Sequence, residues 1–136
     1  MILNVDEIAI SKIYQFVGYK IFMRNDHIVQ LEFENGFSGQ IEDGKNMVET
    51  IKKVKGPDKC LLLVIYKEDN TFSKENREYI ASKEVSEVIK ADALVIKGLA
   101  LRIIGNGYLR INKPGRPTRL FNSRAEAITW LQQFML

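Results

Sequence analysis

The sequence predicts one α/β domain over residues 1–136, with a mixed sheet of four or five strands and about four helices packed on it. Three observations favour this fold class. Short β-branched runs alternate along the chain with amphipathic segments, as strands alternate with helices in α/β proteins. The runs at residues 60–66 and 93–96 are apolar throughout, which is typical of strands covered by helices on both faces. A chain of 136 residues, 46% of them hydrophobic, is also long enough to form one core.

The first half of the chain is expected to hold a hairpin and a helix. Residues 1–17 fit neither a strand period nor a helical period, and we leave them open as an N-terminal extension of uncertain structure. The runs 19–23 and 28–33 are β-rich and flank a polar break, which suits a hairpin. A helix is predicted from Ile41 to the Gly-Pro pair at 56–57, because proline stops it there. Its expected buried residues are Met47, Val48, Ile51 and Val54.

The apolar run 60–66 predicts a central strand, and the loop that follows it is a candidate site. Loops at the ends of such strands hold ligand and regulatory sites in α/β folds. A helix is predicted to follow this loop, from about Lys74 to Lys83. Ser73 stands at its N-cap position, where a hydroxyl accepts a hydrogen bond from the helix amides.

The last third of the chain, from Ala93 to Leu136, predicts strand, helix, strand and helix. The proline-rich turn at 113–117 ends the first of these helices, a short strand is expected at 118–121, and Ser123 begins a capping box for the final helix. The first helix should present one apolar face, formed by Leu101, Ile104, Tyr108 and Leu109. The final helix should present Ala127, Ile128, Trp130, Leu131, Phe134 and Met135.

A different local structure is also compatible with residues 102–111. They fit two strands joined by a turn at Asn106-Gly107, and periodicity alone does not choose between this hairpin and the helix.

Motifs in this third of the chain resemble a known family. Five segments resemble, in order and spacing, the C-terminal half of small bacterial SpoIIAA-like, or STAS/SEC14-like, proteins. They are residues 93–100, 105–106, 108–114, 117–121 and 126–131. The resemblance spans roughly residues 19–134. It implies a mixed sheet with helices packed on it, a helix rather than a hairpin after Gly98, and no known reaction.

Positive charge is concentrated in the same third. Residues 93–125 hold seven Lys and Arg side chains and no acid, against a formal net charge of +3 for the whole chain. Such a one-sided field attracts phosphates, anionic lipid headgroups or an acidic protein. The alternative is a solvated face balanced by Glu42, Asp43, Glu68 and Asp69. The candidate contacts to an anion, ligand or membrane are Lys97, Arg102, Arg110, Lys113, Arg116 and Arg119.

We therefore expect a non-enzymatic binding or regulatory domain that binds a protein partner or an apolar, lipid-like ligand through the basic amphipathic segment 97–119. This segment would cover an apolar pocket or lie on an anionic membrane, and plain core packing is the alternative. Nucleic acid is disfavoured because exposed aromatics do not interleave with the basic residues. A homodimer stays open. The pocket candidates are Leu101, Ile104, Tyr108 and Trp130.

A second function follows from the resemblance. Ser73 occupies a position that resembles the phosphoacceptor of anti-sigma-factor antagonists in the wider STAS group. This implies a regulator that switches partners when Ser73 is phosphorylated. The alternative role of Ser73 is only that of a helix cap.

Catalytic and metal chemistry finds little support. His27 is the only histidine, which argues against histidine triads and metal clusters and suits a hairpin turn. Cys60 begins a buried strand, and we expect a structural role for it. Glu68 and Asp69 are adjacent, and nothing indicates that they converge on a site. Residues 105–107 lack the third glycine of a dinucleotide fingerprint. We expect no cofactor, no metal and no enzymatic activity.

The sequence favours a cytoplasmic protein with, at most, peripheral membrane contact. No apolar run is long enough to span a bilayer, and the first residues lack the pattern of a secretory signal. A single cysteine forms no internal disulfide, which suits a reducing compartment.

Overall fold

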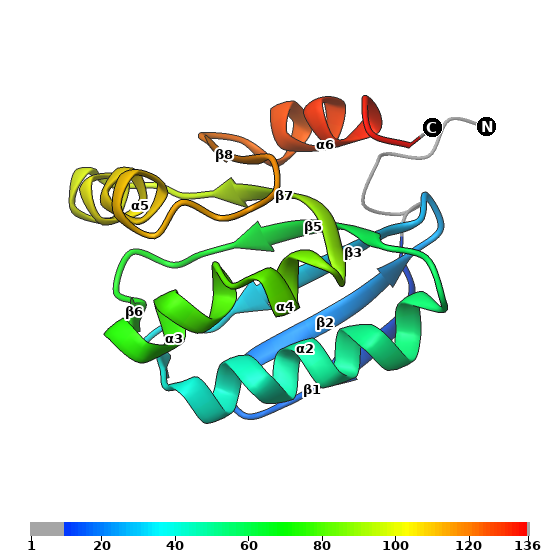
Figure 1. The fold of residues 1–136 in the computed structure, drawn as a ribbon, viewed down its shortest axis with the longest axis horizontal. Coiled ribbons are helices and arrows are strands. Elements are labelled where there is room, and N and C mark those ends of the chain that lie inside the picture. Colours follow the sequence, from blue (N-terminus) through cyan, green and yellow to red (C-terminus); the bar gives the residue numbers. More distant parts are fainter. Residues whose placement is uncertain (1–9, 136) are drawn as a thin grey trace.

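The computed structural model describes residues 10–135, which form a six-stranded mixed sheet with helices on both faces (Figure 1). The strand order is β1-β2-β3-β5-β7-β8. The first three strands pair antiparallel, and β3, β5, β7 and β8 pair parallel. These strands are β1 (Ile10–Gln15), β2 (Tyr19–Arg24), β3 (Ile28–Phe33), β5 (Cys60–Ile65), β7 (Ile89–Val95) and β8 (Thr118–Phe121). Two short strands, β4 (Ser38–Gly39) and β6 (Thr71–Phe72), form a separate parallel pair.

The predicted mixed sheet is confirmed, but its strand count of four or five is wrong because β1 was not foreseen. The register of β1 on β2 shifts between Ile10 and Lys12, and this irregularity interrupts the alternation that marks a strand. Residues 1–9 of the predicted N-terminal extension lie outside the described residues. The β2–β3 hairpin is confirmed, with His27 in its turn at φ 66°.

The described helices are α2 (Ile41–Lys55), α3 (Lys74–Ile80), α4 (Lys83–Ser86), α5 (Leu99–Ile111) and α6 (Arg124–Gln132). Predicted caps are present, since the Ser73 and Ser123 hydroxyls accept from the amides of Asn76 and Glu126, at 3.1 and 3.2 Å. The single helix predicted over 74–83 is divided, because Ser82 caps the one-turn helix α4. None of the helices described here is long and apolar enough to cross a membrane.

Two apolar layers lie on the two faces of the sheet. Alternation along β5 sends Leu62 and Val64 to the layer under α2, while Leu61 and Leu63 face the layer under α6. Figure 1 shows α2 and α6 on opposite sides of the sheet, with α5 at one end of the molecule beyond β7.

The helix α5 resolves the ambiguity of residues 102–111, and the alternative hairpin is wrong. The close contacts around Gly105 explain why a helix packs well at this position. A Cβ atom at this position would lie 3.2 Å from side-chain atoms of Ile96 and Leu120. Glycine therefore lets α5 approach β8 closely, and the helix buries Leu101 on its inner side.

Candidate functional site

An apolar cavity of about 110 Å³ lies between the sheet and α5, on the face that α2 and α3 cover. Its walls come from alternate positions of the parallel strands, from α2 and from the inner side of α5. The lining includes Leu31, Leu62, Val64 and Leu94 from the sheet, Met47, Val48 and Ile51 from α2, and Leu101, Ile104 and Tyr108 from α5.

Three aromatic rings contribute to the cavity wall and pack on one another. The Phe33 ring lies 5.2 Å from Tyr66 and 5.1 Å from Phe72, measured between ring centroids, and Tyr66 meets Phe72 edge to face at 5.6 Å. Such ring pairs add stability beyond the area they bury. This part of the cavity wall is therefore closely packed.

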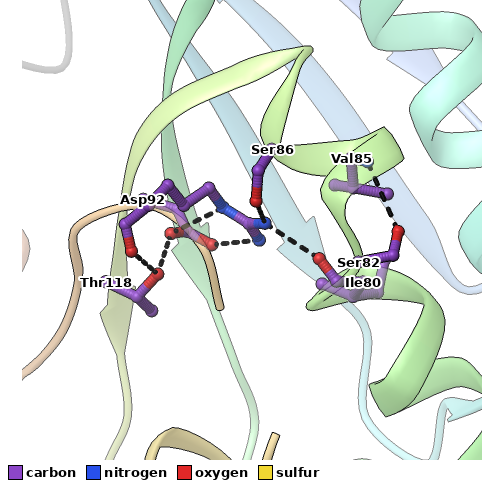
Figure 2. A network of polar contacts seen from close by, with 7 residues as sticks. Ile80, Ser82, Val85, Ser86, Asp92 and Thr118 are labelled. Carbon is purple, nitrogen blue, oxygen red and sulfur yellow. Dashed lines mark hydrogen bonds and ion pairs between the residues drawn. The ribbon is translucent and has the colours of Figure 1, made fainter. Parts of the chain in front are cut away.

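A buried ion pair lies beside the cavity. Asp92, one of the lining residues, is 2% exposed and accepts hydrogen bonds from Arg116 Nε at 3.2 Å and Nη2 at 3.0 Å. Arg116 Nη1 also donates to the Ile80 carbonyl at 2.9 Å and to Ser86 Oγ at 3.0 Å. The Thr118 hydroxyl donates to Asp92 as well (Figure 2). The pair thus connects β7, the start of β8 and the α3–α4 segment.

Two tyrosine hydroxyls are associated with this polar group. Burial raises the pKa of both Tyr66 and Tyr108, and the charge of Arg116 opposes the rise in each case. The Tyr108 hydroxyl is buried and has no hydrogen-bond partner within residues 10–135. The mostly apolar cavity therefore carries unused hydrogen-bonding capacity at Tyr108, and Asn76 of the lining holds a second buried atom, Oδ1, without a partner in the same range.

The structure brings three of the four predicted pocket residues together. Leu101, Ile104 and Tyr108 line the cavity. Trp130 lies on the opposite face of the sheet, where its ring centroid is 5.5 Å from that of Phe121, so it belongs to a different layer. The helical period put Trp130 on the apolar side of α6 but did not say which face of the sheet α6 covers.

The candidate basic residues do not all lie at the surface. Arg116 is buried in the ion pair, which corrects the expectation that it contacts a surface ligand or membrane. Arg102 is half-buried and donates to Asn122, and Arg119 lies over the ring of Phe121 at 5.2 Å. The exposed candidates on or beside α5 are Lys97, Arg110 and Lys113.

The outer side of α5 is apolar and uncovered. Leu99 is 75% exposed, Ile103 63% and Ile111 74%. Successive members of this set are four and eight residues apart, so they follow one side of the helix. Exposed rows of this kind are typical of interaction surfaces.

The remaining candidates have structural surroundings. Ser73 is half-buried, and its amide donates to the Gly39 carbonyl at 2.9 Å while its hydroxyl caps α3. Cys60 is buried, and burial raises the pKa of its thiol to about 12, which keeps the reactive thiolate scarce. Within residues 10–135, no group of three or more His, Cys, Asp or Glu residues could hold a metal ion.

Sequence analysis missed Asp92 and Tyr66 as parts of the site. Asp92 stands inside the apolar run of β7, between Ala91 and Ala93. A carboxylate inside a buried strand is stabilised by a neighbouring cation. An acidic residue in this strand could therefore have predicted an ion pair with an arginine of the basic segment. Tyr66 follows β5 without a local signal, because its role depends on its neighbours in three dimensions.

Comparison with known proteins identifies a fold but not an activity. Residues 21–135 match the family described as a domain of unknown function, DUF7793. Among solved structures, an uncharacterized protein from the DUF3478 family with a SpoIIAA-like fold, from Shewanella loihica PV-4, superposes with a TM-score of 0.57. The two chains share 13% sequence identity over 90% of this chain and 94% of the other. None of the curated proteins matches. The predicted SpoIIAA-like architecture is therefore confirmed.

Proposed function

We propose that this chain, which belongs to the DUF7793 family, binds a small apolar ligand in the cavity beneath α5 and acts without catalysing a reaction. The observation that carries the proposal is the cavity itself, which combines apolar walls with a few polar groups. Ligand sites in proteins commonly have this composition.

The volume of the cavity limits the ligand. A water molecule occupies about 30 Å³ of liquid, so 110 Å³ holds a few small groups or a short alkyl chain. Ligand pockets more often measure about 300–1,000 Å³, and a larger ligand would require α5 to move outward. The main contact of α5 with the sheet is to β8, and its outer side is uncovered, so this movement would disturb little else.

The proposal can be tested with a hydrocarbon probe of matching size. Methylenecyclobutane would be titrated into the isotope-labelled protein while amide and methyl NMR signals are recorded. We expect saturable shifts at residues that line the cavity, such as Val64, Leu101 and Ile104. Signals of Ile128, on the opposite face of the sheet, serve as the control. Absence of saturable shifts at the cavity would refute ligand binding there.

A second candidate function is contact with an anionic membrane, which the outer side of α5 favours. Leu99, Ile103 and Ile111 offer an apolar row, and Lys97, Arg110 and Lys113 lie on or beside the same helix. Residues 93–125 contain no acid that would repel anionic headgroups. Helices that combine an apolar row with basic residues bind at the surface of such bilayers.

Replacing Ile103 by aspartate should weaken membrane binding about tenfold or more, because it removes a buried side chain and adds a charge of the wrong sign. The measurement is flotation with vesicles of equimolar phosphatidylcholine and phosphatidylglycerol at low salt. Val17→Asp is the matched control, since Val17 is exposed in the β1–β2 turn, away from α5. If the wild-type chain does not float, the exposed row of α5 is better explained by a protein partner.

Partner switching through phosphorylation of Ser73 is the weaker candidate. The Ser73 hydroxyl already caps α3, a helix of seven residues, and the side chain is half-buried. A phosphate would have to replace this cap. Intact-mass measurement of the protein isolated from its own cells, across growth conditions, decides the matter, and a mass without any phosphorylated fraction would dismiss the candidate.

A further inference from the structure

The Tyr108 hydroxyl is one of two polar groups of the cavity lining that have no hydrogen-bond partner within residues 10–135; the other, Asn76 Oδ1, lies against Gly44 of α2. Tyr108 lines the cavity from the inner side of α5, and its buried hydroxyl donates a hydrogen bond to none of residues 10–135; Arg116, the side chain that interacts with its oxygen, has only donors to offer. Buried hydroxyl groups in native proteins almost always have a partner, so an exception requires an explanation.

The Asp92 carboxylate receives its hydrogen bonds from other donors. Of the two Asp92 oxygens, Oδ1 accepts from Arg116 Nε and from the Thr118 hydroxyl, and Oδ2 accepts from Arg116 Nη2. Arg116 itself carries only donors. Since no hydrogen bond joins the Tyr108 hydroxyl to these oxygens, its proton has no acceptor among residues 10–135.

The charges beside the cavity also restrict the ligand. Arg116 and Asp92 are buried and neutralise each other. Burial and the neighbouring Asp92 carboxylate both raise the pKa of Tyr108, while Arg116 lowers it, and the net result is a hydroxyl that stays protonated. A charged ligand placed beside this neutral pair would be buried without an opposite charge, which is strongly unfavourable unless the ligand reached Arg77 of the lining, which donates to the Phe72 carbonyl.

We propose that the cavity takes a neutral apolar molecule with one oxygen acceptor, such as a ketone, ester or ether, and that the Tyr108 hydroxyl donates a hydrogen bond to that oxygen. This assignment rests on the proposed ligand-binding function and adds the chemical class of the ligand. The hydrocarbon part would lie against the leucine and valine walls. The oxygen would lie at the end near Asp92.

The test compares two probes of nearly equal shape. Cyclobutanone carries a carbonyl where methylenecyclobutane carries a methylene group, and both are titrated by NMR into the wild-type and Tyr108→Phe proteins. We expect the substitution to weaken cyclobutanone binding about three- to tenfold, the range of one hydrogen bond between neutral groups. Methylenecyclobutane binding should be unchanged. Tyr14→Phe removes a hydroxyl outside the cavity lining and should alter neither affinity.

Other outcomes are equally decisive. If Tyr108→Phe changes both affinities by the same factor, the hydroxyl does not recognise the oxygen and the assignment fails, while the proposed function stands. Tighter binding of cyclobutanecarboxylate than of cyclobutanone would replace the neutral ligand by an acid, with Arg77 of the lining as its partner. If the wild-type protein binds none of these probes, the proposed function fails and the assignment with it.

Thermal unfolding of Tyr108→Phe adds an independent check. A hydroxyl that donates no hydrogen bond can be removed without lowering the melting temperature of the protein.

Discussion

Replacing the buried Arg116 by methionine is expected to lower the free energy of unfolding by about 3–5 kcal/mol. The substitution leaves the Asp92 carboxylate buried without its cation. It also removes donors to the Ile80 carbonyl and to Ser86 Oγ. Urea unfolding followed by circular dichroism measures the loss.

The control for this prediction is Arg110→Met, an equal chemical change at an exposed position of α5. It should shift the free energy of unfolding by no more than about 0.5 kcal/mol. The double variant Asp92→Leu with Arg116→Met should recover part of the loss, because apolar pairs often replace buried ion pairs at little cost. Equal urea midpoints for Arg116→Met and Arg110→Met would contradict a structural role for the ion pair.

Truncating Leu62 to alanine is expected to lower the free energy of unfolding by about 2–5 kcal/mol and to enlarge the cavity beneath α5. An apolar cavity of about 150 Å³ is known to admit benzene. The 110 Å³ already present, together with the volume of the missing side chain, should exceed that size. Saturating benzene should therefore raise the melting temperature of this variant, because a ligand that binds only the native state stabilises it.

Leu63→Ala provides the matched control, one residue further along β5. Leu63 is fully buried and faces the opposite layer, under α6. Its truncation should cost a similar free energy, but benzene should restore much less of it because Leu63 does not line the cavity beneath α5. An equal gain in melting temperature for both variants would show that the benzene effect is not specific to that cavity.

Much of the fold could be predicted from the sequence because local signals coincide with it. The apolar run of β5, the caps at Ser73 and Ser123 and the proline-rich turn after α5 all act over a few residues. The ends of strands and helices that were predicted wrongly depend on contacts between residues far apart in the sequence. The start of β7 was missed because Asp92 interrupts the apolar run, and its burial depends on Arg116, 24 residues later in the chain.

The candidate site was predicted less completely, for the same reason. Helical spacing placed Leu101, Ile104 and Tyr108 on one side of α5, and that side faces the cavity. The spacing could not show that Trp130 lies across the sheet, since periodicity identifies a helix face but not the layer it packs on. Nor could it separate the buried Arg116 from its exposed neighbours, because all lie in one basic segment.

The irregular strand β1 has a consequence for solubility. It lies at one margin of the described sheet, where free backbone groups invite pairing with another copy of the chain. The register shift between Ile10 and Lys12 disturbs the ladder at that margin, and Lys12 places a charge there. A regular, uncharged β1 would present a straight template for fibril growth, so we expect the irregularity that hid this strand from prediction to disfavour edge-to-edge pairing between copies of the chain.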